Sequence, residues 1–110
     1  MPDKPMIDIL EARCRLEDEK IVDRWYDEFH IPVLLGTGKL RSVARYKAVG
    51  TPPGTIRFFT ICRYDSLKDF KEFLACPEFA AAGEKSPEMK SVKMDDSPPV
   101  HCVLVKEWKR

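Results

Sequence analysis

The order of hydrophobic patterns along this chain limits its fold more than any other sequence feature. Apolar residues alternate with a period of two, or gather in β-branched and aromatic runs, in four segments, and they recur at helical spacing in two segments between them. The strand-like segments are residues 6–16, 40–49, 55–64 and 100–108, and the main helical segments are residues 17–31 and 66–76. This order predicts an α+β, ferredoxin-like βαββαβ fold with an antiparallel four-stranded sheet.

Proline and glycine residues predict how the first helix ends. Pro32 has no backbone N–H and disfavours a helical conformation in the residue before it, so the helix should pause at His30. Because proline fits the first turn of a helix, a short second helix should follow over residues 32–35. Gly36 and Gly38 should then end it before the second strand.

The second half of the chain has its own start and stop signals. Ser66 precedes an amphipathic run, and Asp69 follows three residues later, which predicts a capped helix start. Pro77 predicts a break and a restart of this helix. Residues 83–99 are polar, contain several prolines and lack a clear period, so we expect a loop there, with a lid over a pocket as one alternative.

The composition argues against several classes of protein. The chain of 110 residues carries 19 basic and 18 acidic side chains, a balance that argues against nucleic-acid binding. No apolar run is long enough for a membrane helix, and the first five residues lack an apolar signal core, so we expect a cytoplasmic protein that does not contact membranes. The four cysteines are scattered, which argues against a zinc site. Without asparagine or glutamine, no mechanism can use a side-chain amide.

The predicted sheet has one face without a helical cover. Both helices of such a fold pack on the same face, so the opposite face meets water in a monomer. Two sets of side chains are candidates for this open face. One set consists of Ile7, Ile9, Phe59, Ile61, Val103 and Val105, and the other consists of the residues that alternate with them. Because either set is too apolar for water, we predict a homodimer in which two sheets pack face to face and enclose a cavity.

Three segments resemble a known superfamily. They are residues 25–32 (WYDEFHIP), Gly38 with residues 44–46 (ARY), and residues 73–80 (FLACPEFA). These segments are similar to the dimeric α+β barrel superfamily and most similar to its EthD-type branch, in which a helix ends in an acidic–x–His–x–Pro sequence before a glycine and an Arg-Tyr strand. The resemblance covers about residues 6–108 and implies one domain over residues 1–110.

The resemblance also implies a range of functions. It implies a homodimeric barrel with a pocket in each protomer, and the superfamily includes cofactor-free aromatic monooxygenases, isomerases and polyketide cyclases. Its haem-degrading members use an asparagine that this chain lacks. The leading hypothesis is therefore a cofactor-independent enzyme that acts on an aromatic or polyketide-like compound. The alternatives are a non-catalytic dimer that binds an apolar or aromatic small molecule, and a structural dimer whose pocket has lost its role.

His30 is the candidate catalytic residue. Its side chain titrates near neutral pH, which suits a general acid or base. The competing interpretation is a structural histidine that caps the first helix. His101 lies in the last strand among apolar neighbours, where it either belongs to the wall of the barrel or meets a ligand.

The other candidate substrate-binding residues are charged or aromatic. Arg45 or Arg13, together with Tyr46, would orient an oxyanion, and Glu11 would pair with an arginine on a neighbouring strand. The alternative is that these residues form ion pairs at the rim or at the dimer interface. Trp25 belongs to an aromatic set that suits either a pocket for an aromatic molecule or ordinary core packing. Two distant histidines do not make a metal cluster, so we expect no metal and no cofactor.

Overall fold

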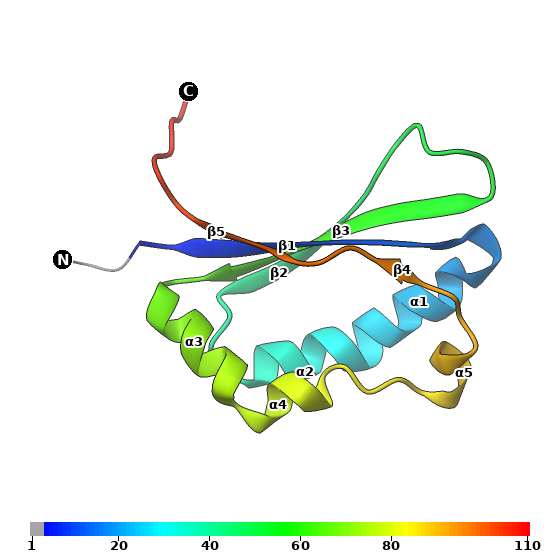
Figure 1. The fold of residues 1–110 in the computed structure, drawn as a ribbon, viewed down its shortest axis with the longest axis horizontal. Coiled ribbons are helices and arrows are strands. Elements are labelled where there is room, and N and C mark those ends of the chain that lie inside the picture. Colours follow the sequence, from blue (N-terminus) through cyan, green and yellow to red (C-terminus); the bar gives the residue numbers. More distant parts are fainter. Residues whose placement is uncertain (1–3) are drawn as a thin grey trace.

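The computed structural model describes residues 4–110 and contains one antiparallel sheet. Its strands are β1 (Met6–Arg15), β2 (Ser42–Lys47), β3 (Thr55–Tyr64), β4 (Asp95–Asp96) and β5 (Val100–Val103). The long strands β3 and β1 lie at the centre, β2 forms one edge, and β4 and β5 both pair with β1 at the other edge (Figure 1). The predicted βαββαβ order along the chain is confirmed, with the last strand divided in two.

The helices all lie on one face of the sheet (Figure 1). They are α1 (Glu19–Trp25), α2 (Ile31–Gly36), α3 (Leu67–Ala75), α4 (Pro77–Ala81) and α5 (Pro87–Lys90). A short 3-10 turn (Leu16–Asp18) precedes α1. No helix within residues 4–110 has both the length and the apolar character that a membrane span needs.

The first helix does not pause at His30 as predicted. A π turn over Tyr26–His30 joins α1 to α2, and the N–H of Ile31 donates to the carbonyl of Tyr26, five residues earlier. Pro32 stands in the first turn of α2, where its missing N–H is tolerated, so the wider turn carries the helix past the proline. Gly38, with a φ of +72°, stands just beyond the end of this helix.

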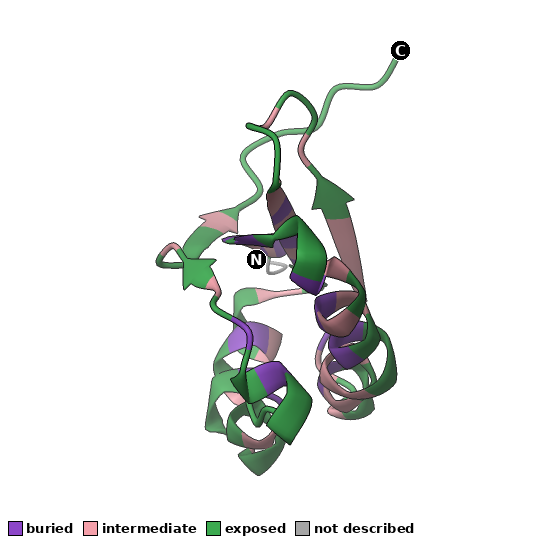
Figure 2. Cartoon of the chain, turned by 90° about the vertical axis from the view of Figure 1, so that its right-hand side faces the viewer, coloured by how far each residue is buried: buried purple, intermediate pink, exposed green. Residues whose placement is uncertain are grey.

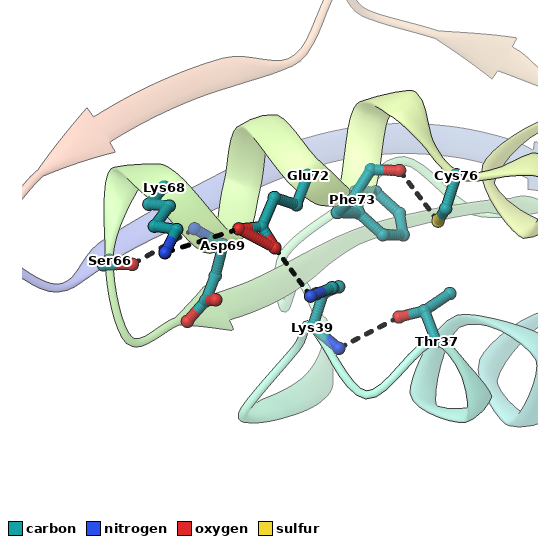
Figure 3. A network of polar contacts seen from close by, with 8 residues as sticks. All are labelled: Thr37, Lys39, Ser66, Lys68, Asp69, Glu72, Phe73 and Cys76. Carbon is teal, nitrogen blue, oxygen red and sulfur yellow. Dashed lines mark hydrogen bonds and ion pairs between the residues drawn. The ribbon is translucent and has the colours of Figure 1, made fainter.

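The helix α3 begins where the sequence predicts. The hydroxyl of Ser66 accepts a hydrogen bond of 3.1 Å from the N–H of Asp69. Figure 3 shows how Lys39, in the loop after α2, reaches Glu72 of α3, with an N–O distance of 2.7 Å. The chain is extended at Cys76, so the predicted break before Pro77 is confirmed. These contacts hold α3 beside α2.

The segment 83–99 is more ordered than the predicted loop. The hydroxyl of Ser86 caps the short helix α5, and the side chain of Met89 is completely buried. This single apolar side chain, too isolated to create a sequence period, fixes α5 against α1. The sequence pattern missed this helix because four residues are too few to show a helical period.

The last strand starts and ends earlier than predicted. Its pairing with β1 begins at Asp95 and ends at Val103, whereas we expected residues 100–108. Pro98 and Pro99 interrupt it because neither residue has an N–H to donate. Pairing resumes where Val100 lies opposite Ile9.

The helices cover one face of the sheet and leave the other face open (Figure 2). Side chains at even positions of β1 face the helices, and those at odd positions face the open side. Four of the residues predicted for one face lie together on the open face: Ile7, Ile9, Phe59 and Ile61. The predicted places of Val103 and Val105 are wrong. Val103 lies opposite buried Met6, and Val105 lies beyond the end of β5.

Candidate functional site

A cavity of about 340 Å³ lies between the sheet and the helices α2, α3 and α4. Most of its wall is apolar, and its apolar residues include Leu34, Phe70, Phe73, Leu74 and Phe79. Its polar residues are Asp8, Tyr26, His30, Thr60, Tyr64 and His101. A cavity of this size falls at the lower end of the usual range for small-molecule pockets, ~300–1,000 Å³. Both histidines of the chain line it.

A hydrogen-bonded chain of three side chains forms one wall of the cavity. Asp8, which is 6% exposed, lies directly opposite His101 in the pairing of β1 with β5. One carboxylate oxygen of Asp8 lies 2.5 Å from Nδ1 of His101, and the other accepts a hydrogen bond of 2.9 Å from the hydroxyl of Tyr64. Burial, followed by the charge of Asp8, raises the pKa of Tyr64, so its hydroxyl stays protonated and donates.

The hydrogen bond to Asp8 determines which ring nitrogen of His101 carries a proton. A carboxylate accepts hydrogen bonds, so Nδ1 of His101 carries a proton toward Asp8. Nε2, the other ring nitrogen, is then available to a molecule in the cavity. The ring of His101 also lies against Phe70, with ring centroids 4.9 Å apart, so its orientation is held from two sides.

His30 stands in a different setting. Its Nδ1 lies 2.5 Å from the carbonyl oxygen of Ala82, and its ring stacks on Trp25 with centroids 4.4 Å apart. Burial lowers the pKa of His30, although the contact with Ala82 acts in the opposite direction. Because the carbonyl only accepts, the neutral ring has its proton on Nδ1 and an acceptor lone pair on Nε2. The π turn, a feature found often at functional sites, places Tyr26 and His30 side by side at this wall.

A cysteine in the cavity wall does not supply a nucleophile. Burial raises the pKa of Cys62 to about 12, with the charge of Asp8 acting in the same direction. The thiolate is the reactive form of cysteine, and it is therefore absent near neutral pH. The chemistry of the cavity consequently depends on its imidazoles, hydroxyls and the Asp8 carboxylate.

Trp25 and Arg45, both predicted to bind substrate, lie behind the cavity wall. The indole N–H of Trp25 donates a hydrogen bond of 3.0 Å to the carbonyl of Glu84, which holds the start of the segment 83–99. Arg45 pairs with Asp23 at 2.8 Å, and its guanidinium lies 4.2 Å from the ring centroid of Tyr26. Neither residue lines this cavity, although Trp25 lines a neighbouring one that His30 also borders, and both contact side chains that line the first cavity.

The remaining predicted residues are on or near the open face of the sheet. One carboxylate oxygen of Glu11 accepts hydrogen bonds of 2.7 Å from Arg13 and from Arg57 of the neighbouring strand. The predicted ion pair of Glu11 with a cross-strand arginine is thus present, and the Arg57 hydrogen bond lowers the pKa of Glu11. Tyr46 is 57% exposed. The structure brings His30 and His101 together and leaves Glu11, Arg13 and Tyr46 outside their cavity.

Sequence reasoning missed Asp8 and Tyr64. A signal was present, because Asp8 alternates with Leu10, Ala12 and Cys14 in a strand whose faces are both largely apolar. A carboxylate on a covered face must have hydrogen-bond partners. The identity of those partners depends on the register of three strands, which the pattern of one strand does not contain.

Comparison with known proteins supports the fold at low sequence identity. No family model matches the chain, and no curated protein matches it. A hydroxynitrile lyase from Passiflora edulis is 13% identical with a TM-score of 0.63, over 98% of this chain and 100% of that chain. A dimeric ferredoxin-like protein from an uncultured marine organism is 18% identical with a TM-score of 0.67, over 99% of this chain and 95% of that chain.

A third solved structure carries the name of the branch that the sequence resembles. An EthD family protein from Bacillus halodurans is 20% identical with a TM-score of 0.58, over 84% of this chain and 97% of that chain. Together these structures confirm the predicted α+β, ferredoxin-like fold. The same fold carries proteins with different names, so the function of this chain must be argued from its own cavity.

Proposed function

We propose that this protein is a small-molecule enzyme that moves protons on an aromatic or polyketide-like compound, without a cofactor. The observation that carries the proposal is the pair of imidazoles that line one apolar cavity in different hydrogen-bond settings. An apolar wall binds the ring of such a compound, and the few polar groups orient it.

The two histidines have different roles in this proposal. His30, neutral and with Nδ1 held by the carbonyl of Ala82, is the general base that removes a proton at Nε2. His101 is the general acid, because the Asp8 carboxylate accepts from Nδ1 and orients the ring, and Tyr64 holds that carboxylate in place. A carbonyl compound with an acidic C–H bond would lose that proton to His30 while its oxygen accepts a proton from His101.

The non-catalytic alternative rests on the same geometry. A histidine stacked on Trp25 and bonded to a backbone carbonyl also serves to hold a helix and a loop together. In that case the cavity binds an apolar molecule without changing it. Loss of the His30 imidazole should slow turnover in an enzyme, whereas a binding protein has no turnover to lose.

Deuterium exchange separates these functions. Tetralone, a bicyclic aromatic ketone, has acidic C–H bonds beside its carbonyl, and their exchange in heavy water is followed by NMR. We expect the protein to accelerate this exchange, and we expect His30→Gln and His101→Gln each to slow it by ~100-fold or more, with tetralone affinity within a few-fold of wild type. Tyr46→Phe, on the open face, is the control and should leave the rate unchanged.

Two results would contradict the enzyme hypothesis. Exchange that is not accelerated although tetralone binds would favour the binding function. Exchange that survives in both histidine variants would remove the imidazoles from the mechanism. Native mass spectrometry of the freshly purified protein should accompany the assay, because any retained molecule identifies the ligand directly.

We also propose that the protein forms a homodimer through the open face of the sheet. The support is the apolar set Ile7, Ile9, Phe59 and Ile61 on that face, and the dimeric ferredoxin-like proteins that share the fold. Ile61→Asp should convert a dimer into a folded monomer in sedimentation experiments, and a wild-type monomer would contradict the proposal.

A cytoplasmic location is consistent with four free cysteines.

A further inference from the structure

A second chamber lies beside the cavity that contains both histidines. It measures about 320 Å³ and lies beside the first one at the β4 edge. The two share six lining residues: Leu10, Tyr26, His30, Thr60, Gly83 and Pro99. We call the cavity that contains His101 the inner chamber and the second one the outer chamber. His30 therefore stands where the two chambers meet.

The junction exists because two consecutive prolines interrupt the edge of the sheet. The N–H of Ser97 donates to the carbonyl of Glu11 at 3.0 Å, and the next residues that pair with β1 begin at Val100. Between them, Pro98 and Pro99 have no N–H, so the edge strand makes no ladder bond beside Leu10. This gap leaves Leu10 partly exposed, and Leu10 and Pro99 both border the two chambers.

The chambers differ in chemistry. The inner chamber is lined largely by aromatic and aliphatic side chains. The outer chamber adds the polar side chains of Lys85, Asp96 and Ser97. Within residues 4–110, none of these three side chains makes a hydrogen bond or an ion pair to another residue. Asp96 lies opposite Ala12, on the helix side of the sheet, whereas its neighbour Asp95 lies opposite Arg13 on the other side.

The charges of the outer chamber nearly cancel. Glu11 also borders it, but the Glu11 carboxylate is bonded to Arg13 and Arg57. One ammonium, from Lys85, and one carboxylate, from Asp96, remain. Donors and acceptors of both signs suit a neutral hydroxyl or carbonyl group better than a fully charged end.

We infer that the ligand is an amphipathic molecule that spans both chambers, with an aromatic or hydrocarbon part in the inner chamber and a neutral polar end in the outer chamber. This inference rests on the proposed function and adds the shape and polarity of the substrate. The atom that exchanges a proton with His30 lies between the two parts of the molecule, at the junction. A fully apolar molecule fills only the inner chamber and leaves the polar groups of the outer chamber to water.

Binding of a matched pair of probes tests the inference. Naphthalene has only the apolar part, and naphthylethanol adds a short hydroxyl-bearing arm. We expect naphthylethanol to bind about three- to tenfold more tightly in calorimetric titrations, the gain of one or two net hydrogen bonds. In NMR spectra, naphthylethanol should shift the methyl resonance of Met94, which lines the outer chamber, and naphthalene should leave it unchanged.

Variants on each side of the junction separate the two chambers. Asp96→Ala combined with Ser97→Ala should reduce the advantage of naphthylethanol and keep the affinity for naphthalene. Asp95→Ala is the matched control, because its side chain is on the opposite face, and it should change neither affinity. Leu74→Trp should weaken both probes, because Leu74 lines the inner chamber and is partly exposed, so the larger ring has room to enter.

The outcomes distinguish this inference from the proposed function. Equal affinities for the two probes, unchanged in the Asp96 and Ser97 double variant, would overturn the two-chamber inference and leave the inner chamber as a binding site. A loss of naphthalene affinity in that double variant would also overturn it, because the chambers would then not act separately. Failure of both probes to bind at their solubility limits would contradict the proposed function as well as the inference.

Discussion

The two faces of the sheet handle carboxylates in opposite ways. On the helix side, Asp8 is buried and uses both oxygens, one with His101 and one with Tyr64. On the open side, Glu11 meets two arginines in contact with solvent. A buried carboxylate is costly unless it is fully hydrogen-bonded, whereas exposed ion pairs contribute little to stability. The comparison teaches that a carboxylate on the covered face depends on specific hydrogen-bond partners, whereas charge on the open face is easily replaced.

The same contrast holds for apolar side chains. Phe58 and Phe59 are consecutive in β3 and point to opposite faces, and Phe58 is 2% exposed. Phe58 packs among Tyr26, Val22 and Met89 in one of two core clusters. Phe59 contributes to the open face, where a partner subunit is proposed to cover it. The stability of the monomer should therefore depend on Phe58 far more than on Phe59.

The largest expected effect is the loss of stability when Phe58 in β3 is truncated. Phe58→Ala should lower the free energy of unfolding by about 3–5 kcal/mol, because it leaves a cavity in a packed core. Phe59→Ala should cost less at low protein concentration, where the monomer dominates. Urea denaturation of both variants at several protein concentrations measures the difference. If both variants lose the same stability at every concentration, Phe59 on the open face stabilises the monomer as much as Phe58 does.

Tyr64→Phe tests how much the buried carboxylate of Asp8 depends on its hydrogen bond from Tyr64. The change removes the hydroxyl that donates to buried Asp8, and we expect a loss of about 1–3 kcal/mol in the free energy of unfolding. Tyr46→Phe, on the open face, removes an exposed hydroxyl of the same kind and should be neutral. Chemical denaturation of this pair gives the comparison directly, and an unchanged stability in Tyr64→Phe would mean that Asp8 does not need this donor.

The fold was predictable because it depends on periodic patterns. The run at residues 55–64 coincides with β3, and Ser66 caps α3 as its spacing with Asp69 predicts. The continuous helix across Pro32 was not predictable from the proline rule, because the π turn that accommodates it has no sequence period of its own. The short helix α5 was missed for the same reason.

The candidate site was predictable only in part. His30 and His101 were found because histidine is rare in this chain and suits acid–base chemistry. Asp8 and Tyr64 were missed because their contact depends on the register of β1 with β3 and β5. Arg45 was one alternative for binding the ligand; one nitrogen of its guanidinium pairs with Asp23, and the group lies against Tyr26 and Phe58. Strand position alone does not show which partner a charged side chain takes.

The partly buried imidazole of His30 should make stability depend on pH. Burial lowers the pKa of folded His30 below its ordinary value of 6.5, so the unfolded chain binds this proton at a higher pH than the folded one. The stabilising effect of a neutral His30 is complete above pH 6.5 and decreases as the pH falls toward the lowered pKa of the folded state, below which there is no further change. His30→Phe should lack this component when unfolding is measured between neutral and mildly acidic pH. A variant whose pH profile runs parallel to wild type would mean that His30 titrates normally in the folded protein.

The smallest expected effect is on the open face. Glu11→Gln removes the charge that Arg13 and Arg57 share, and the hydrogen bond from Arg57 is what lowers the pKa of Glu11. Because these groups meet solvent, the change should be slight and should shrink further as salt is added. Thermal unfolding at low and high salt, measured at several protein concentrations, checks this expectation. A large loss that persists in high salt would show that the ion pair is covered in the native state. The face opposite the cavity would then be an interface whose assembly depends on charge as well as on its apolar residues.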